Sequence, residues 1–130
     1  MSEKTRIIII DDSQSFRKGM KALLEIQPDM QVTGLSPSGQ KGIELIEALH
    51  PDLVLLDAQM PGLSGMEVTR EIKKKWPQIK VILMTMYVDF RERAIESGVD
   101  AFVTRGVPPE DMLSVIRGII KEETVFSKEN

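Results

Sequence analysis

Three aspartates follow directly after two strongly apolar segments of the chain. Asp11 and Asp12 come after the four isoleucines Ile7–Ile10, and Asp57 comes after the apolar run Leu53–Leu56. Unbroken apolar runs of this length are typical of strands that are buried on both faces of a parallel sheet. The carboxyl ends of such strands form the ligand-binding edge of open α/β folds, so this edge is the place where we expect chemistry.

Carboxylates gathered at one edge define the chemistry to expect. They repel one another, which raises the pKa of at least one of them unless a cation neutralises the cluster. Hard oxygen ligands with room for water suit Mg²⁺ better than a transition metal. A metal beside a carboxylate neutralises charge on a transferring phosphoryl group, and an aspartate can itself form an acyl phosphate. Thr85 and Arg105 end two further apolar segments and offer a hydroxyl and a positive charge to such a group.

Five short apolar strands that alternate with five amphipathic helices are needed to position these side chains. We expect the strands over Ile7–Ile10, Met30–Ser36, Leu53–Leu56, Lys80–Thr85 and Ala101–Thr104. The helices are expected after Ser13, around Ile43–Leu49, from Ser64 or Gly65, over Val88–Ser97 with Phe90, Ala94 and Ile95 facing inward, and from Pro108 and Pro109. Gly98 is the expected cap of the fourth helix.

This alternation predicts an α/β fold with a doubly wound parallel sheet. No glycine-rich phosphate loop of the G-x-G-x-x-G type follows the first strand, because Asp11, Asp12 and Ser13 stand there. The sequence therefore favours the flavodoxin-like (βα)5 arrangement with strand order 2-1-3-4-5 over the dinucleotide-binding order. In the favoured order the first and third strands are neighbours, which brings Asp11, Asp12 and Asp57 together.

The composition is that of an ordinary globular domain. The chain has 130 residues, of which 42% are hydrophobic and 28% charged, and these values predict one domain with one core. A net charge of −3 gives no electrostatic reason to expect a nucleic-acid surface. The apolar runs are too short to span a membrane, and the absence of cysteine is compatible with the reducing cytoplasm, where we expect the protein.

The pattern resembles the receiver (response regulatory) domain of two-component response regulators over essentially the whole chain. The resemblance rests on Asp11 and Asp12, on Asp57 with the following Met60-Pro61-Gly62 and Gly65, and on Thr85, Gly98 and Phe102. It implies a CheY-like fold and a phosphoprotein in which Asp57 accepts a phosphoryl group from a phosphohistidine of a sensor histidine kinase. It also implies that the protein is not an enzyme, apart from Mg²⁺-assisted self-phosphorylation and autodephosphorylation.

The same resemblance assigns roles to individual residues. It implies Mg²⁺ held by Asp12, Asp57 and the backbone carbonyl of Gln59, with Asp11 holding a metal-bound water. Thr85 and Phe102 would be the switch pair, and the fourth helix, fifth strand and fifth helix would form the output face. Gln59 and Tyr87 flank the site and are candidates for tuning dephosphorylation.

The loop Met60–Gly65 and the C-terminal segment look most like the LuxR/NarL class of transcription regulators. We expect the receiver domain over residues 1–124 and the start of a linker or tail over 125–130. DNA would be contacted only through an output domain that this chain lacks, which favours an excised receiver over a single-domain protein. The family also implies a possible homodimer.

Two departures from the family pattern leave alternatives open. Arg105 stands where the family has a lysine, and it is either a resting ion-pair partner of Asp57 or a phosphoryl ligand. The segment from Thr85 to Gly98 is shorter than the family pattern. Both features motivate a second hypothesis, a receiver that acts as a phosphorylation-independent interaction module.

Some of these residues, and the function itself, also have other interpretations. Paired aspartates after a strand are commonly a helix N-cap, and Phe102 is compatible with a core position. A Mg²⁺-dependent phosphohydrolase of small substrates is disfavoured, because 130 residues leave no second substrate-binding domain. A flavin-binding role is disfavoured, because acidic residues occupy the edge where the anionic phosphate of the flavin would lie.

Overall fold

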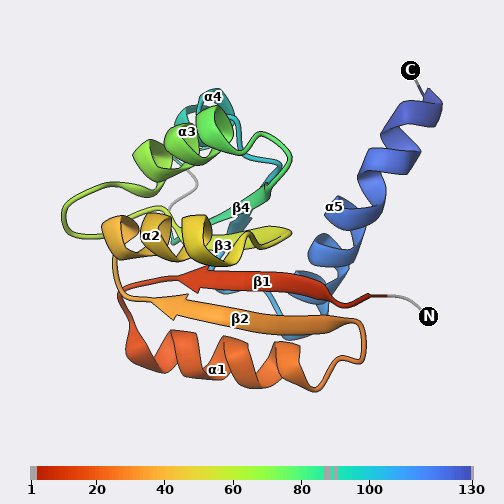
Figure 1. Cartoon of the computed structure of the whole chain (residues 1–130), viewed down its shortest axis with the longest axis horizontal. Helices are drawn as coiled ribbons and strands as arrows, with labels where there is room; N and C mark the ends of the chain where they lie inside the picture. Colours follow the sequence, from red (N-terminus) through yellow and green to blue (C-terminus); the bar gives the residue numbers. More distant parts are fainter. Residues whose placement is uncertain (1–2, 87–88, 90, 130) are drawn as a thin grey trace.

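The computed structural model describes residues 3–86, 89 and 91–129, and within them five strands alternate with five helices. The elements are β1 (Thr5–Ile10), α1 (Gln14–Glu25), β2 (Met30–Ser36), α2 (Gly39–Leu49), β3 (Leu53–Asp57), α3 (Gly65–Lys75), β4 (Lys80–Thr85), α4 (Arg91–Glu96), β5 (Ala101–Thr104) and α5 (Pro109–Glu129). The strands are parallel and lie in the order β2-β1-β3-β4-β5 (Figure 1). The predicted flavodoxin-like sheet of order 2-1-3-4-5 is therefore confirmed.

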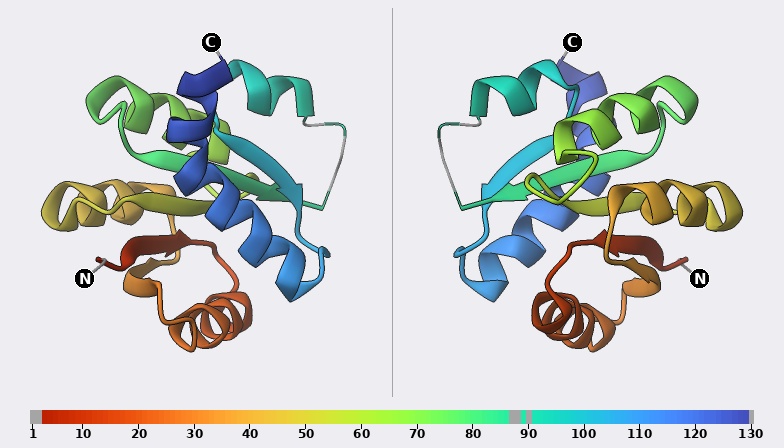
Figure 2. Two further views of the ribbon diagram at one scale, coloured as in Figure 1. Left: turned by 90° about the vertical axis from the view of Figure 1, so that its right-hand side faces the viewer. Right: turned by 90° about the vertical axis from the view of Figure 1, so that its left-hand side faces the viewer.

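Helices cover both faces of the sheet, as the apolar strands require (Figure 2). Alternate residues of a strand point to opposite faces, so Ile8 and Ile10 pack with α2, α3 and α4, whereas Ile7 and Ile9 pack with α1 and α5. The four isoleucines are completely buried. This explains why an unbroken apolar run, and not an alternating one, encodes the interior strand β1.

Serine N-caps begin the helices that start at the carboxyl edge of the sheet. The hydroxyl of Ser13 accepts a hydrogen bond from the backbone N–H of Phe16, and Ser38 caps α2 in the same way. Ser64 and Glu67 form a reciprocal capping box at the start of α3. These caps fix the places where the chain leaves the edge that carries the aspartates.

Several predicted boundaries and one predicted contact differ from the structure. β1 begins at Thr5, and β3 includes Asp57. The prediction that Ile95 faces inward is wrong, because its side chain is 58% exposed. α4 has six residues, and only Ala94 among them is buried. The buried face of this short helix is therefore narrow and does not include Ile95. Val88 and Phe90 lie outside the described residues.

The predicted cap of the fourth helix agrees with the structure. Gly98 has φ +96°, a left-handed conformation that suits the residue closing α4. None of the helices in the described ranges is long and apolar enough to cross a membrane. α5 runs through residue 124 to Glu129, and the expected division between 1–124 and 125–130 stays a prediction.

Candidate functional site

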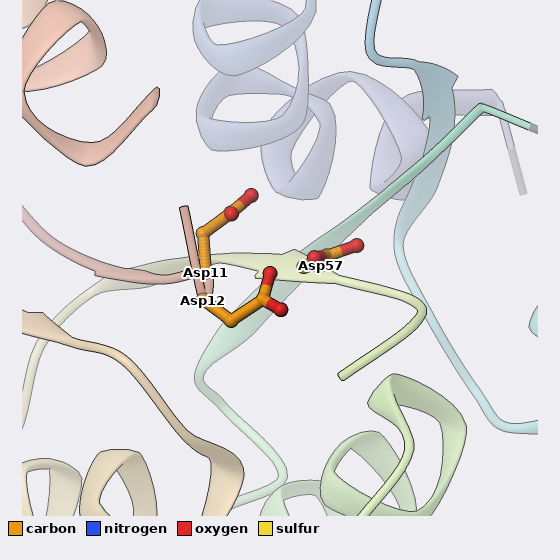
Figure 3. A group of neighbouring side chains, drawn as sticks. All are labelled: Asp11, Asp12 and Asp57. Carbon is orange, nitrogen blue, oxygen red and sulfur yellow. The ribbon is translucent and has the colours of Figure 1, made fainter. Parts of the chain in front are cut away.

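Asp11, Asp12 and Asp57 meet at the carboxyl edge of the sheet (Figure 3). Ile10 of β1 pairs with Leu56 of β3, so the residues that follow these two positions are brought side by side. One carboxylate oxygen from each aspartate lies within 4.8 Å of the other two. Asp11 and Asp57 are buried, and Asp12 is exposed. The prediction that these three aspartates lie close together is therefore confirmed.

Backbone groups hold the two buried carboxylates. Oδ1 of Asp57 accepts a hydrogen bond from the backbone N–H of Gln59 at 3.1 Å, and Oδ1 of Asp11 accepts one from Ser13 at 2.9 Å. The peptide after Asp57 is held as well, since the N–H of Ala58 donates to the carbonyl of Met84 at 2.7 Å. The acidic side chains therefore sit on a rigid part of the edge.

Burial perturbs both carboxyl groups. It raises the pKa of Asp57 to about 6, against the N–H of Gln59 and the charge of Arg105, and the neighbouring Asp11 adds to the rise. Burial likewise raises the pKa of Asp11, opposed by the N–H of Ser13 and by Arg105. The expectation that crowding raises at least one pKa is confirmed, although loss of hydration contributes more than repulsion.

Arg105 supplies a positive charge to the cluster. Its Nη1 lies 3.5 Å from Oδ2 of Asp57, and its Nη2 lies 3.2 Å from Oδ2 of Asp11. The backbone N–H of Arg105 donates to the carbonyl of Thr85 at 2.9 Å, which anchors the residue just after β5. The resting ion pair is therefore present, and the role as a phosphoryl ligand stays a prediction.

The donor set fits a hard divalent cation. Among the buried side-chain oxygens of the described residues, Oδ2 of Asp11 accepts no hydrogen bond, although Nη2 of Arg105 is near it. The guanidinium supplies charge but no hydrogen bond to this oxygen, and a metal or its bound water would satisfy it. The side chain of Gln59 is exposed, and the metal role of its backbone carbonyl stays a prediction.

Thr85 lies on β4, the strand beside that of Asp57, and Phe102 lies on β5, one strand further along the sheet. Thr85 is buried at the end of β4, one residue after Met84, which pairs with Asp57. Phe102 is half-buried against the core, and it lines a 420 Å³ cavity with Ile95 and Val99. These positions are compatible with both a core role and the predicted switch role of Phe102. Tyr87 lies outside the described residues.

Phe16 is a neighbour of the site that the sequence did not reveal. In the sequence, Phe16 is one of several apolar residues at helical spacing after Ser13, which indicates only a buried face of the first helix. In the structure its ring lies under the guanidinium of Arg105, 4.4 Å from the guanidinium carbon to the ring centroid. Arg105 follows 89 positions after Phe16 in the sequence, so only tertiary folding brings the two side chains into contact.

The doubly wound sheet and the buried aspartates at its edge define a flavodoxin-like domain with an acidic site. The family model of the response regulator receiver domain matches residues 7–117. The chain therefore belongs to the response regulator receiver domain family of two-component systems.

Individual relatives agree with this family. The response regulator protein VraR of Staphylococcus epidermidis is 36% identical over 126 residues, which cover 95% of this chain and 60% of VraR. A crystal structure of a DNA-binding response regulator of the LuxR family from Staphylococcus aureus is 33% identical, with a TM-score of 0.83, over 88% of this chain and 98% of that one. The expected likeness to the LuxR class is confirmed.

A solved receiver domain supports the expected fold family. The CheY-like response regulator receiver domain protein from Methanospirillum hungatei JF-1 is 28% identical, with a TM-score of 0.84, over 95% of this chain and 98% of that one. By contrast, this chain spans about 60% of the length of the VraR proteins that it matches.

Proposed function

We propose that this chain is a phospho-accepting signalling switch, which takes a phosphoryl group from a phosphohistidine of a sensor histidine kinase onto Asp57. The observation that carries the proposal is the position of Asp57. Its buried carboxylate ends the central strand β3, beside two further aspartates and one arginine. Membership of the receiver family supports the same donor and acceptor.

The transfer forms one bond and breaks one bond. A carboxylate oxygen of Asp57 attacks phosphorus, and the new P–O bond forms as the P–N bond to the imidazole breaks. The imidazole leaves with the electron pair and takes up a proton from solvent, so that an acyl phosphate remains on Asp57. A pKa of about 6 leaves most Asp57 ionised at neutral pH, which is the form that attacks.

The chain's own residues orient this reaction. The N–H of Gln59 holds Oδ1 of Asp57, while Oδ2 faces the guanidinium of Arg105. Arg105 is therefore close to the carboxylate that would receive the negatively charged phosphoryl group. Asp11, Asp12, Asp57 and the backbone carbonyl of Gln59 would hold Mg²⁺, which when bound neutralises charge on the phosphoryl oxygens.

The response to phosphorylation would involve Thr85 and Phe102. In our proposal the hydroxyl of Thr85 moves toward the phosphoryl group, and the ring of Phe102 turns inward. The face formed by α4, β5 and α5 then carries the signal to a second copy or to an output domain. Transcription control would require such an output domain, and the solved relative from Staphylococcus aureus is described as a DNA-binding response regulator.

A second candidate function is a phosphorylation-independent interaction module. The observation that favours it is the resting ion pair, because Arg105 already neutralises part of the charge on Asp11 and Asp57. In this case Asp57 would remain in a fixed ion pair with Arg105 and would not accept a phosphoryl group.

Intact mass after incubation with acetyl phosphate and Mg²⁺ tests the two candidates. The unmodified chain and Asp111→Asn, which changes an exposed acid on α5, are expected to gain one phosphoryl group. Asp57→Asn is expected to gain none. If the unmodified chain gains none from acetyl phosphate or from any tested sensor kinase, while Mg²⁺ binding is measurable, the second candidate replaces the first.

A further inference from the structure

The guanidinium of Arg105 is held between two carboxylates and an aromatic ring. Asp57 and Asp11 lie at its two amino groups, at 3.5 and 3.2 Å. The ring of Phe16 lies beneath it, 4.4 Å from ring centroid to guanidinium carbon. The side chain of Arg105 is only 20% exposed, so the ring shields much of it from water.

Phe16 is itself fixed in place. Its backbone N–H donates to the N-cap hydroxyl of Ser13 at 3.2 Å, one turn after the aspartates. The same Ser13 donates its own N–H to Asp11. The ring packs against the apolar cluster under α1 and α5. One rigid turn therefore positions both the acid and the ring that Arg105 contacts.

The aromatic ring of Phe16 and the guanidinium of Arg105 are chemically suited to each other. A planar guanidinium stacks on an aromatic face while its amino groups bind carboxylates at its edge. The point charge of a lysine ammonium does not offer this flat surface. The ring of Phe16 therefore suits an arginine at position 105 better than it would suit a lysine.

We propose that Phe16 is a positioning residue, whose ring holds Arg105 between Asp11 and Asp57, where the guanidinium competes with a divalent cation for these carboxylates. This inference rests on the proposed function in that Mg²⁺ is the cation concerned. A positive charge fixed beside the cluster repels an incoming cation and occupies oxygens that would bind it. Without the ring, Arg105 turns toward solvent and the three aspartates bind the cation more tightly.

Calorimetric titration of the whole chain with Mg²⁺ at one fixed pH tests the inference. Phe16→Leu is expected to tighten Mg²⁺ binding roughly three- to tenfold, because it removes the cation–π contact. Phe16→Met serves as a second ring-free variant of similar volume, and Phe16→Tyr keeps the ring and is expected to retain the original affinity. Arg105→Gln is expected to tighten binding at least as much as Phe16→Leu.

Two controls separate positioning from a general loss of stability. Leu24→Val weakens the packing of α1 but leaves the ring and Arg105 in place, and we expect unchanged Mg²⁺ affinity. In the double variant, Phe16→Leu adds nothing to Arg105→Gln, since the ring acts only through the arginine. Circular dichroism of each variant establishes that it is folded.

The outcomes are distinct from those of the phosphorylation test. Unchanged or weaker Mg²⁺ binding in both ring-free variants would overturn the inference, as would additive effects in the double variant. So would a failure of Phe16→Leu and Arg105→Gln to bind Mg²⁺ at all. The titration contains no phosphodonor, so a chain that shows the expected affinities but gains no phosphoryl group refutes only the proposed function.

Discussion

Gly65 lies so close to Asp57 that a Cβ atom on Gly65 would stand 2.4 Å from the carbonyl oxygen of Asp57. The same atom would stand 2.7 Å from the Cα of Ala58. The N–H of Gly65 donates to the carbonyl of Ala58 at 2.9 Å, so the start of α3 rests directly on the segment that carries the candidate phosphoacceptor. Glycine at this position allows helix and strand backbones to touch.

Gly65→Ala is expected to destabilise the domain by about 1–3 kcal/mol, because backbone atoms must move to admit the methyl group. The shift is expected to displace the carboxylate of Asp57 and to weaken Mg²⁺ binding. Urea unfolding and Mg²⁺ titration measure the two effects. Gly19→Ala is the matched control, since no atom lies within 4 Å of the added carbon and alanine favours the exposed helix by about 0.5–1 kcal/mol. Equal stability of the two variants would contradict the contact.

Asp57→Asn is expected to stabilise the metal-free domain above the pKa of Asp57. Because burial raises this pKa to about 6, the folded state disfavours the ionised carboxylate, and its neutral form favours folding. The original chain should therefore lose stability relative to the variant as the pH rises from the ordinary carboxyl pKa of 3.8 to about 6, and the difference should level off at higher pH. We expect an advantage of about 1–3 kcal/mol for the variant at about pH 8, and a smaller one at about pH 5.

Urea unfolding with a chelator present measures this pH dependence. Asp111→Asn replaces an exposed acid and is expected to show no such advantage. An advantage of Asp57→Asn that is the same at both pH values would contradict the assigned pKa.

Lys73→Met is expected to destabilise the domain by about 1–3 kcal/mol, because its partner Asp100 is half-buried and loses its charge pair. Lys73 donates to Asp100 at 2.7 Å and to the carbonyl of Ile79 at 2.8 Å, and Asp100 also accepts from the N–H of Val81. Lys75→Met removes an exposed pair with Glu71 on the same helix and is expected to cost below about 0.5 kcal/mol. Thermal unfolding of both variants in parallel checks the difference, and equal losses would refute it.

Thr85→Val is expected to preserve the fold and abolish most of the phosphorylation response. Valine matches the shape of threonine but lacks the hydroxyl that the proposed switch requires, whereas Thr85→Ser retains it. The backbone amide resonance of Phe102, recorded before and after addition of acetyl phosphate, reports the response. A full shift in Thr85→Val would remove Thr85 from the switch.

The sequence predicted the sheet and the acid cluster because both depend on short-range patterns. Runs such as Ile7–Ile10 and Leu53–Leu56 are unambiguous, and the acids directly after them mark the edge. The missing glycine-rich loop then decided the strand order. Each step used neighbouring residues only, and each agrees with the structure.

The remaining features depend on contacts that no local pattern encodes. Ile95 was placed inward by helical spacing, but α4 is too short to bury more than Ala94. The stacking of Arg105 on Phe16 arises only when β5 pairs with β4 and brings Arg105 to the carboxyl edge of the sheet. Similarly, the large rise in the pKa of Asp57 follows mainly from burial, whereas the sequence emphasised repulsion between acids.

The sequence positions of the site residues also determine the order in which the site can be completed as the chain is synthesised. Asp11 and Asp57 leave the ribosome early, but Arg105 follows 94 residues after Asp11 and 48 residues after Asp57. A nascent or truncated chain that ends before β5 holds the acids without the arginine that pairs with them. Such a chain must bring the acids of β1 and β3 together without the positive charge of Arg105. The late arginine thereby makes completion of the sheet electrostatically favourable and disfavours incomplete domains.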